Sequence, residues 1–171
     1  SEMCAAKDTI FMVGGSEDIY QSCAPIFTAM GRESVYMGKS GTGAAIKLVV
    51  NLVLAINRVG LAEGLTLAKK AGIDQALALD VLKKSAAFSK AMDQKGYRMV
   101  YRDFYPPIGH MTTHYKDVQL MVSYAGKLKC PVPVISFTAQ ALASEMSKRP
   151  GDRDSSAIIC FYDDLIKEDK G

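Results

Sequence analysis

The sequence lacks the features that mark several common classes of protein. It has no tryptophan and only two histidines, and its 21 basic and 18 acidic residues leave a net charge of +3. So small an excess of positive charge gives no electrostatic case for binding nucleic acid. Hydrophobic residues make up 49% of the chain and charged residues 23%, so a packed core is expected and extensive disorder is not.

Cysteine and long apolar runs are also scarce. The four cysteines stand at positions 4, 23, 130 and 160, without a CxxC motif or a close pair, so neither a zinc ribbon nor a disulfide scaffold is indicated. This pattern fits a reducing, intracellular compartment, cytoplasmic or mitochondrial. The longest apolar stretch, residues 44–56, contains Lys47 and Asn51 and is predicted to be too short and too polar to span a bilayer. The chain starts at Ser1 with nothing resembling a signal peptide, and we expect that the start of a longer protein has been removed.

Residues 1–37 have the pattern of a single β-α-β unit. Residues 9–13 are β-branched or apolar and lead into two glycines, which predicts a short strand and a turn. A helix from the possible cap Ser16 to about Met30 and a strand over 34–37 follow. One such unit cannot make a stable sheet alone. We therefore predict that residues 1–37 are the end of an otherwise missing, larger domain.

Residues 38–171 show no convincing strand, which predicts an all-helical domain and a mainly α fold. The helices are expected over residues 44–71, 74–84, 89–100, 115–128, 134–148 and 152–166, with a loop over 103–109. The first of these would be about 42 Å long. It is apolar nearly all round, which is typical of a helix buried at the centre of a domain.

A glycine cluster over residues 38–43 precedes this long helix. A P-loop would need a glycine at position 33, which is Glu33, and the fingerprint GxGxxG fails at Ile46. Two interpretations remain open. The cluster is either a tight turn that lets two elements approach closely, or an anion or carbonyl site formed by free amides at a helix N-terminus.

Three polar residues near helix starts are candidates for chemistry. Lys47 and Asn51 are four residues apart, on one face of the apolar helix. Burial disfavours the charged form of a lysine, which suits proton transfer, and the amide of Asn51 could bind the same ligand. Lys116, beside Asp117, could reach back to a ligand from the start of a later helix. The alternatives are a lysine that reaches the surface beside an asparagine, and an ordinary solvated helix start.

Metal and hydrolase chemistry have little support. His110 and His114 are four residues apart and could be combined with Asp103 or Asp117, but HExxH fails because Met111 follows His110. We therefore expect no metal site. Neither serine nor cysteine stands in a nucleophile-elbow setting, so covalent hydrolysis is not indicated.

Taken together, the motifs resemble the β-hydroxyacid dehydrogenases, a family that includes 3-hydroxyisobutyrate dehydrogenase and the glyoxylate/succinic semialdehyde reductases. The matching pieces, in chain order, are Val13-Gly14-Gly15, Pro25 to Gly31, Gly38-x-x-Gly41-x-Gly43-x-x-x-Lys47-x-x-x-Asn51, Ala62-Glu63-Gly64, Tyr105-Pro106-Pro107, Lys116-Asp117 and Gly151-Asp152-x-Asp154. Their order and spacing are most similar to the semialdehyde reductase branch.

The resemblance implies a Rossmann domain that binds NAD or NADP, followed by a helical domain like the C-terminal domain of 6-phosphogluconate dehydrogenase. The substrate would be a small 3-hydroxy acid or semialdehyde, and the protein a dimer or tetramer. Lys47 would be the general acid/base and Asn51 would orient substrate. The turn of Gly41, Thr42 and Gly43 would shape the substrate pocket. Lys116 would contact the cofactor. Without the dinucleotide fingerprint, this chain alone is expected to be inactive.

The sequence departs from the family pattern at Val50, Gly109 and Thr113, which leaves the reaction type intact and the substrate open. Two other functions are alternatives to this one. One is a non-catalytic oligomerisation module on the same fold, as in a chromatin-associated homologue that lacks the lysine; Lys47 argues against it. The other is a phosphate- or nucleotide-binding domain using residues 38–43, which the failed P-loop spacing disfavours.

Overall fold

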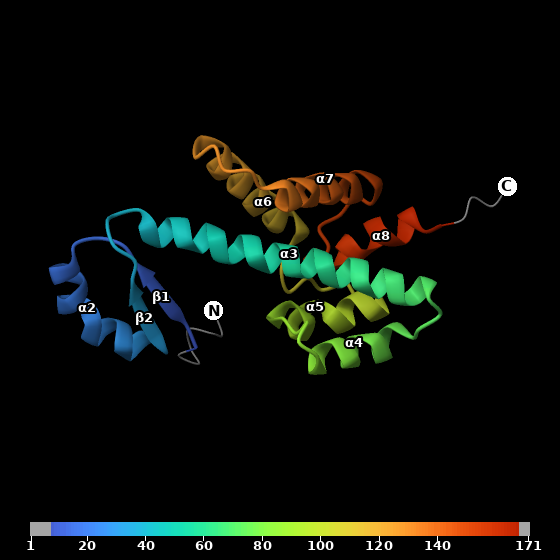
Figure 1. Cartoon of the computed structure of the whole chain (residues 1–171), viewed down its shortest axis with the longest axis horizontal. Coiled ribbons are helices and arrows are strands. Elements are labelled where there is room, and N and C mark those ends of the chain that lie inside the picture. Colours follow the sequence, from blue (N-terminus) through green and yellow to red (C-terminus); the bar gives the residue numbers. More distant parts are fainter. Residues whose placement is uncertain (1–7, 168–171) are drawn as a thin grey trace. The chain divides into compact units, whose positions relative to one another are not determined.

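The computed structural model describes residues 8–167, which fall into two compact units divided between Val50 and Asn51 (Figure 1). The division lies inside one helix, α3 (Thr42–Lys70). In the first unit, β1 (Ile10–Val13) and β2 (Glu33–Tyr36) are parallel, with Ile10 opposite Glu33 and Val13 opposite Tyr36. Helix α2 (Glu17–Met30) connects the two strands.

The first unit is held together mainly by aromatic side chains. The rings of Phe11 and Phe27 are 5.4 Å apart, and the hydroxyl of Tyr20 donates to the carbonyl oxygen of Ser34 at 3.0 Å. Every residue of α2, all of which are described, retains some exposure. A sheet of two strands with an unburied helix has little core of its own. The arrangement agrees with the predicted β-α-β unit.

Two glycines fix the approach of α3 to β1 within this unit. A Cβ atom on Gly14 would lie 2.7 Å from Oγ1 of Thr42, and one on Gly43 would collide with the carbonyl oxygen of Met12. Only glycine allows so close an approach. The tight-turn interpretation of the glycine cluster therefore holds for Gly43.

The second unit contains the later part of α3 followed by a series of shorter helices. They are α4 (Gln75–Lys84), α5 (Lys90–Tyr101), α6 (Met111–Lys127), α7 (Pro133–Lys148), the 3₁₀ turn η1 (Ser155–Ile158) and α8 (Ile159–Leu165). Figure 1 shows the α4–α5 pair on one side of α3 and the α6–α7 pair on the other. The predicted mainly α fold is confirmed.

The 3₁₀ turn η1 lies at the centre of this helical unit. It packs against α5, α6, α7 and α8, and all four of its residues are buried. Asp154 caps it, because its side chain accepts a hydrogen bond from the backbone N–H of Ser156. The helix predicted over residues 152–166 is therefore found as this capped 3₁₀ turn followed by α8.

Helix α3 is buried only in its second half, which corrects the expectation of a helix buried along its length. Its buried residues are Ala55, Val59, Leu61, Ala62, Leu65 and Thr66. Val49, Val50 and Val53 are exposed in the described part of the chain. The apolar residues of α3 therefore form a surface that the neighbouring helices cover only in its second half.

By length and composition alone, α3 is also long and apolar enough to cross a membrane. The expectation concerned only the apolar stretch of residues 44–56, whereas this criterion applies to the whole helix, which ends at Lys70 close to its predicted end at residue 71. Core helices of soluble proteins meet the same criterion, and the second half of α3 packs against other helices of its unit.

Helix α6 begins at Met111, four residues before the predicted start. Asp152 accepts hydrogen bonds from the backbone N–H of Thr112 at 3.3 Å and from its hydroxyl at 3.0 Å, and the N–H of Met111 donates to the carbonyl oxygen of Arg153. The free donors at this helix start are thus satisfied by a segment 40 residues away. No local signal near Tyr115 could reveal such a cap.

Candidate functional site

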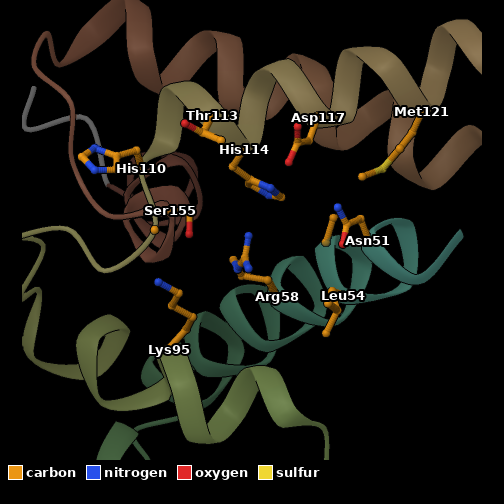
Figure 2. Close-up of a pocket in the computed structure, with 12 residues that line it drawn as sticks. Asn51, Leu54, Arg58, Lys95, His110, Thr113, His114, Asp117, Met121 and Ser155 are labelled. Carbon is orange, nitrogen blue, oxygen red and sulfur yellow. The ribbon is translucent and has the colours of Figure 1, made fainter. Parts of the chain in front are cut away.

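A polar pocket of about 190 Å³ lies in the second unit, between α3, α5, α6 and η1 (Figure 2). Its lining residues are Asn51, Leu54, Ala55, Arg58, Lys95, Gly109, His110, Thr113, His114, Asp117, Met121 and Ser155. The four residues from α3 follow the spacing i, i+3, i+4, i+7, which places them on one face of the helix. A pocket of this size suits a small acid and is too small for a whole dinucleotide.

A buried ion pair lies beside the pocket, and its lysine, Lys95, is one of the lining residues. Nζ of Lys95 lies 2.9 Å from Oδ1 and 2.7 Å from Oδ2 of Asp154, and both side chains are almost completely buried. The Asp154 carboxylate also accepts from the N–H groups of Ile108 and Gly109, at 2.9 and 3.0 Å, and from the N–H and hydroxyl of Ser156. The aspartate thus ties α5, the loop before α6 and η1 together.

The hydrogen bonds that Asp154 accepts favour its ionised form. Burial acts to raise the pKa of Asp154, but the bonds from Lys95, Ser156 and Gly109 outweigh it and hold the pKa well below its usual range. Burial lowers the pKa of Lys95, and the bond to Asp154 offsets part of that effect. The pair is therefore a carboxylate and an ammonium at neutral pH.

Arg58 lines the same pocket. Its Nε atom is buried and has no hydrogen-bond partner among the described residues. Burial lowers the pKa of Arg58, with a smaller opposing effect from Asp154. A guanidinium stays protonated even so. The pocket therefore contains an enclosed positive charge with an unused donor.

The positive charges of Arg58 and Lys95 affect the pKa of His114, which lines the pocket from α6. Burial, together with the positive charges of Arg58 and Lys95, lowers the pKa of His114 to about 3. The imidazole is therefore neutral across the physiological range of pH.

Four of the predicted site residues, Gly41, Thr42, Gly43 and Lys47, lie in the first part of α3 or directly before it. Gly41, Thr42 and Gly43 form the start of α3, where the hydroxyl of Thr42 donates to the carbonyl oxygen of Lys39 at 2.7 Å. Lys47 is exposed, so the described residues do not supply the burial that was expected for it.

The other two predicted residues differ in their relation to the pocket. Asn51 lines the pocket and Lys116 does not. The Lys116 side chain is 68% exposed, and its Nζ atom lies 3.8 Å from the carboxylate of Asp117, which does line the pocket. The amine is therefore free to reach a ligand outside the pocket.

Sequence reasoning missed Arg58, Lys95 and Ser155. Arg58 could have been found, because it stands seven residues after Asn51 in an apolar helix and so shares its face. Lys95 and its partner Asp154 are 59 residues apart in the chain, and no local pattern connects them.

The two histidines have separate roles. Nδ1 of His110 lies 2.6 Å from Oδ2 of Asp152, beside the start of α6. His114 is enclosed between the positive charges. Within residues 8–167, no group of three or more histidine, cysteine or acidic side chains is arranged to hold a metal ion.

Comparisons with known proteins agree with the motifs. A family model described as NAD-binding of NADP-dependent 3-hydroxyisobutyrate dehydrogenase matches residues 41–162. The chain is 29% identical over 150 residues to the chloroplastic glyoxylate/succinic semialdehyde reductase 2 of Arabidopsis thaliana, covering 88% of this chain and 42% of that protein. It is 30% identical over 149 residues to the cytokine-like nuclear factor N-PAC of Aedes aegypti, covering 87% and 26%.

A solved structure shares the fold. The crystal structure of 3-hydroxyisobutyrate dehydrogenase from Salmonella typhimurium superposes with a TM-score of 0.84 at 25% identity, covering 93% of this chain and 56% of that one. The chain thus spans between about a quarter and just over half of the length of these relatives. The predicted class of cofactor, NAD or NADP, is confirmed by the matching family. Because the family model matches most of its length, the chain belongs to the NAD-binding family of NADP-dependent 3-hydroxyisobutyrate dehydrogenase, as its β-hydroxyacid dehydrogenase motifs indicate.

Proposed function

We propose that the chain is the C-terminal catalytic part of an NAD(P)-dependent β-hydroxyacid dehydrogenase or semialdehyde reductase. The observation that carries the proposal is the row of polar side chains on α3. Lys47 stands one helical turn before Asn51, and Asn51 opens onto the polar pocket. A proton donor and an amide at this spacing suit reduction of a carbonyl group.

Features of the chain fit a dinucleotide. A Cβ atom on Gly38 or Gly41 would meet nothing within 4 Å, so these glycines leave open space beside the start of α3. The exposed amine of Lys116 is available for an anionic phosphate. When bound, NAD or NADP supplies or accepts the hydride.

The chain's own residues handle the proton and the orientation of the substrate. In the direction of reduction, Nζ of Lys47 donates a proton to the carbonyl oxygen as hydride arrives at the carbonyl carbon, which gives an alcohol and a neutral amine. In oxidation the amine takes the hydroxyl proton. Asn51 orients the substrate by hydrogen bonding, and Gly41, Thr42 and Gly43 shape the pocket near the helix start. The substrate class is a small 3-hydroxy acid or semialdehyde.

The test is steady-state kinetics on the full-length protein that contains this chain. General acid/base catalysis contributes about 10²–10⁴-fold to rate. We expect Lys47→Ala to lower kcat by at least about a hundredfold with nearly unchanged cofactor affinity. Lys116→Ala should weaken cofactor binding more than it slows the reaction. Lys84→Ala, at an exposed lysine on α4, is the matched control and should change neither quantity.

A normal kcat for Lys47→Ala would show that the lysine is structural and would remove the catalytic assignment. That outcome would favour the second candidate, a non-catalytic oligomerisation module on the same fold. The exposed apolar residues Val49, Val50 and Val53 on α3 support an oligomer under either function.

A further inference from the structure

The unpartnered guanidinium of Arg58 is the feature of the pocket that the proposed reaction leaves unused. A guanidinium carries five N–H donors, and burying one of them without an acceptor costs free energy. In Figure 2, Arg58 points from α3 into the space between Lys95, Ser155 and His114. Its Nε atom is enclosed there with no acceptor among the described residues.

Positive charge exceeds negative charge at this end of the pocket. Asp154 is the carboxylate that acts on Arg58, but its oxygens are already bonded to Lys95 and to backbone N–H groups. Nη1 of Arg98 lies 3.8 Å from the same carboxylate. Nη2 of Arg98 also lies 3.8 Å from the carboxylate of Asp103, so the uncompensated charge is that of Lys95 and Arg58 on the single carboxylate of Asp154.

The other ionisable groups of the pocket do not cancel this excess. Asp117 lies near Asn51 in Figure 2, and its carboxylate is 3.8 Å from Nζ of Lys116. His110 is hydrogen-bonded to Asp152, away from Arg58. An anion would complete the Arg58 end of the pocket.

We infer that the pocket binds the carboxylate of the substrate at Arg58, with Ser155 and the neutral ring of His114 beside it. The inference rests on the proposed function, since it takes the ligand to be the molecule that is reduced or oxidised. It adds a specificity-determining residue for the proposed reaction.

The spacing along α3 indicates which acids fit. Arg58 is seven residues after Asn51, which is about 10 Å along the helix axis. Side chains of a helix lean towards its N-terminus, so the guanidinium approaches Asn51 from that distance. The carboxylate and the reacting carbon are therefore separated. Lys47, the proposed proton donor, is eleven residues before Arg58, about 16 Å along the helix axis, so an acid bound at Arg58 has to extend along α3 for its carbonyl group to approach that lysine.

Binding to the 171-residue chain, without cofactor, tests this inference. The probes are 4-hydroxybutanoate and 1,4-butanediol, which have the same chain length and differ in the carboxylate. We expect calorimetry to detect binding of 4-hydroxybutanoate and none of butanediol. Arg58→Gln should weaken binding of the acid at least about tenfold, because a hydrogen bond to a charged group is lost. Arg32→Gln removes an exposed arginine charge outside the pocket and should leave the affinity unchanged.

Three outcomes would overturn the inference. They are equal binding of the diol, undiminished binding of the acid by Arg58→Gln, and binding of sulfate through Arg58 without binding of the acid. The last would mean that the pocket takes an inorganic anion and not the substrate.

The thermal stability of the ligand-free variants separates a ligand site from a structural role. Because Nε of Arg58 has no hydrogen-bond acceptor among the described residues, and Asp154 is already bonded to Lys95, Arg58→Gln should leave the Tm of the ligand-free chain unchanged or raise it. A marked fall in Tm, also seen in Arg58→Lys, would show that the arginine is structural. Neither measurement uses hydride transfer, so a failure here is distinct from failure of the Lys47 test.

Discussion

Removal of either member of the Lys95–Asp154 pair should destabilise the helical unit, and the two losses should be unequal. Asp154→Ala removes the acceptor for Lys95, for the N–H groups of Ile108 and Gly109, and for Ser156. It also leaves a buried ammonium without a counter-charge. Breaking a buried pair from one side typically costs about 3–5 kcal/mol.

Lys95→Met should cost less, about 1–2 kcal/mol, because only one hydrogen-bonding group is lost. The Asp154 carboxylate then keeps its backbone donors and the nearby charge of Arg98, whose Nη1 atom is 3.8 Å away. The prediction is therefore an order: Asp154→Ala is more harmful than Lys95→Met. Lys90→Met, on the same helix but exposed, is the matched control and should change stability by less than about 0.5 kcal/mol.

The assay is urea unfolding of the 171-residue chain at pH 7, followed by circular dichroism. If Asp154→Ala does not fold, Asp154→Asn, which keeps one acceptor oxygen, provides the comparison. Equal losses for the aspartate and lysine variants would refute the reasoning, since they would mean that the charge pair alone, and not the backbone donors, stabilises the unit. A loss for Asp154→Ala below about 1 kcal/mol would refute it as well.

Two further predictions concern the pH dependence of stability and the assembly of the chain. The pKa of His114 is lowered to about 3 in the folded chain, so between that value and about 6.5 the unfolded state binds a proton that the folded state does not. The contribution of His114 to the free energy of unfolding is therefore fully present above about pH 6.5 and is lost as the pH falls towards 3. His114→Gln should flatten that part of a plot of unfolding free energy against pH. An unchanged slope would contradict the prediction. Because Val49 and Val53 are exposed on α3, we expect the chain to form a dimer or tetramer and Val53→Glu to dissociate it; sedimentation would show this, and a wild-type monomer at micromolar concentration would contradict it.

The sequence was sufficient for the order and type of the elements because apolar periodicity and glycine turns are local signals. The β-α-β unit and the long helix needed no information from elsewhere in the chain. Position 111, where α6 begins, could not be read in this way, because the acceptor that caps the helix is Asp152. Prediction from the sequence therefore fails where the two interacting residues are far apart in the chain.

The same limit applies to the candidate site. Asn51 was found because it interrupts an apolar helix, and Arg58 stands out by the same reasoning once the face of α3 is followed for two turns. The Lys95–Asp154 pair was invisible, since each residue alone resembles ordinary surface polarity. The exposure of Lys47 could not be predicted either, because an apolar pattern does not say which neighbours cover it.

The central position of η1 has a consequence for how the chain is made. Ser155–Ile158 lie close to the C-terminal end of the chain and fill the space between α5, α6, α7 and α8. During synthesis from the N-terminus, α4 to α7 leave the ribosome before this segment exists. Until then Lys95 lacks the carboxylate of Asp154, and the pocket lacks Ser155, which is part of its lining. The nascent helical unit therefore remains incomplete until residues 154–158 have been made, and a chain truncated before residue 154 would form helices without the complete pocket.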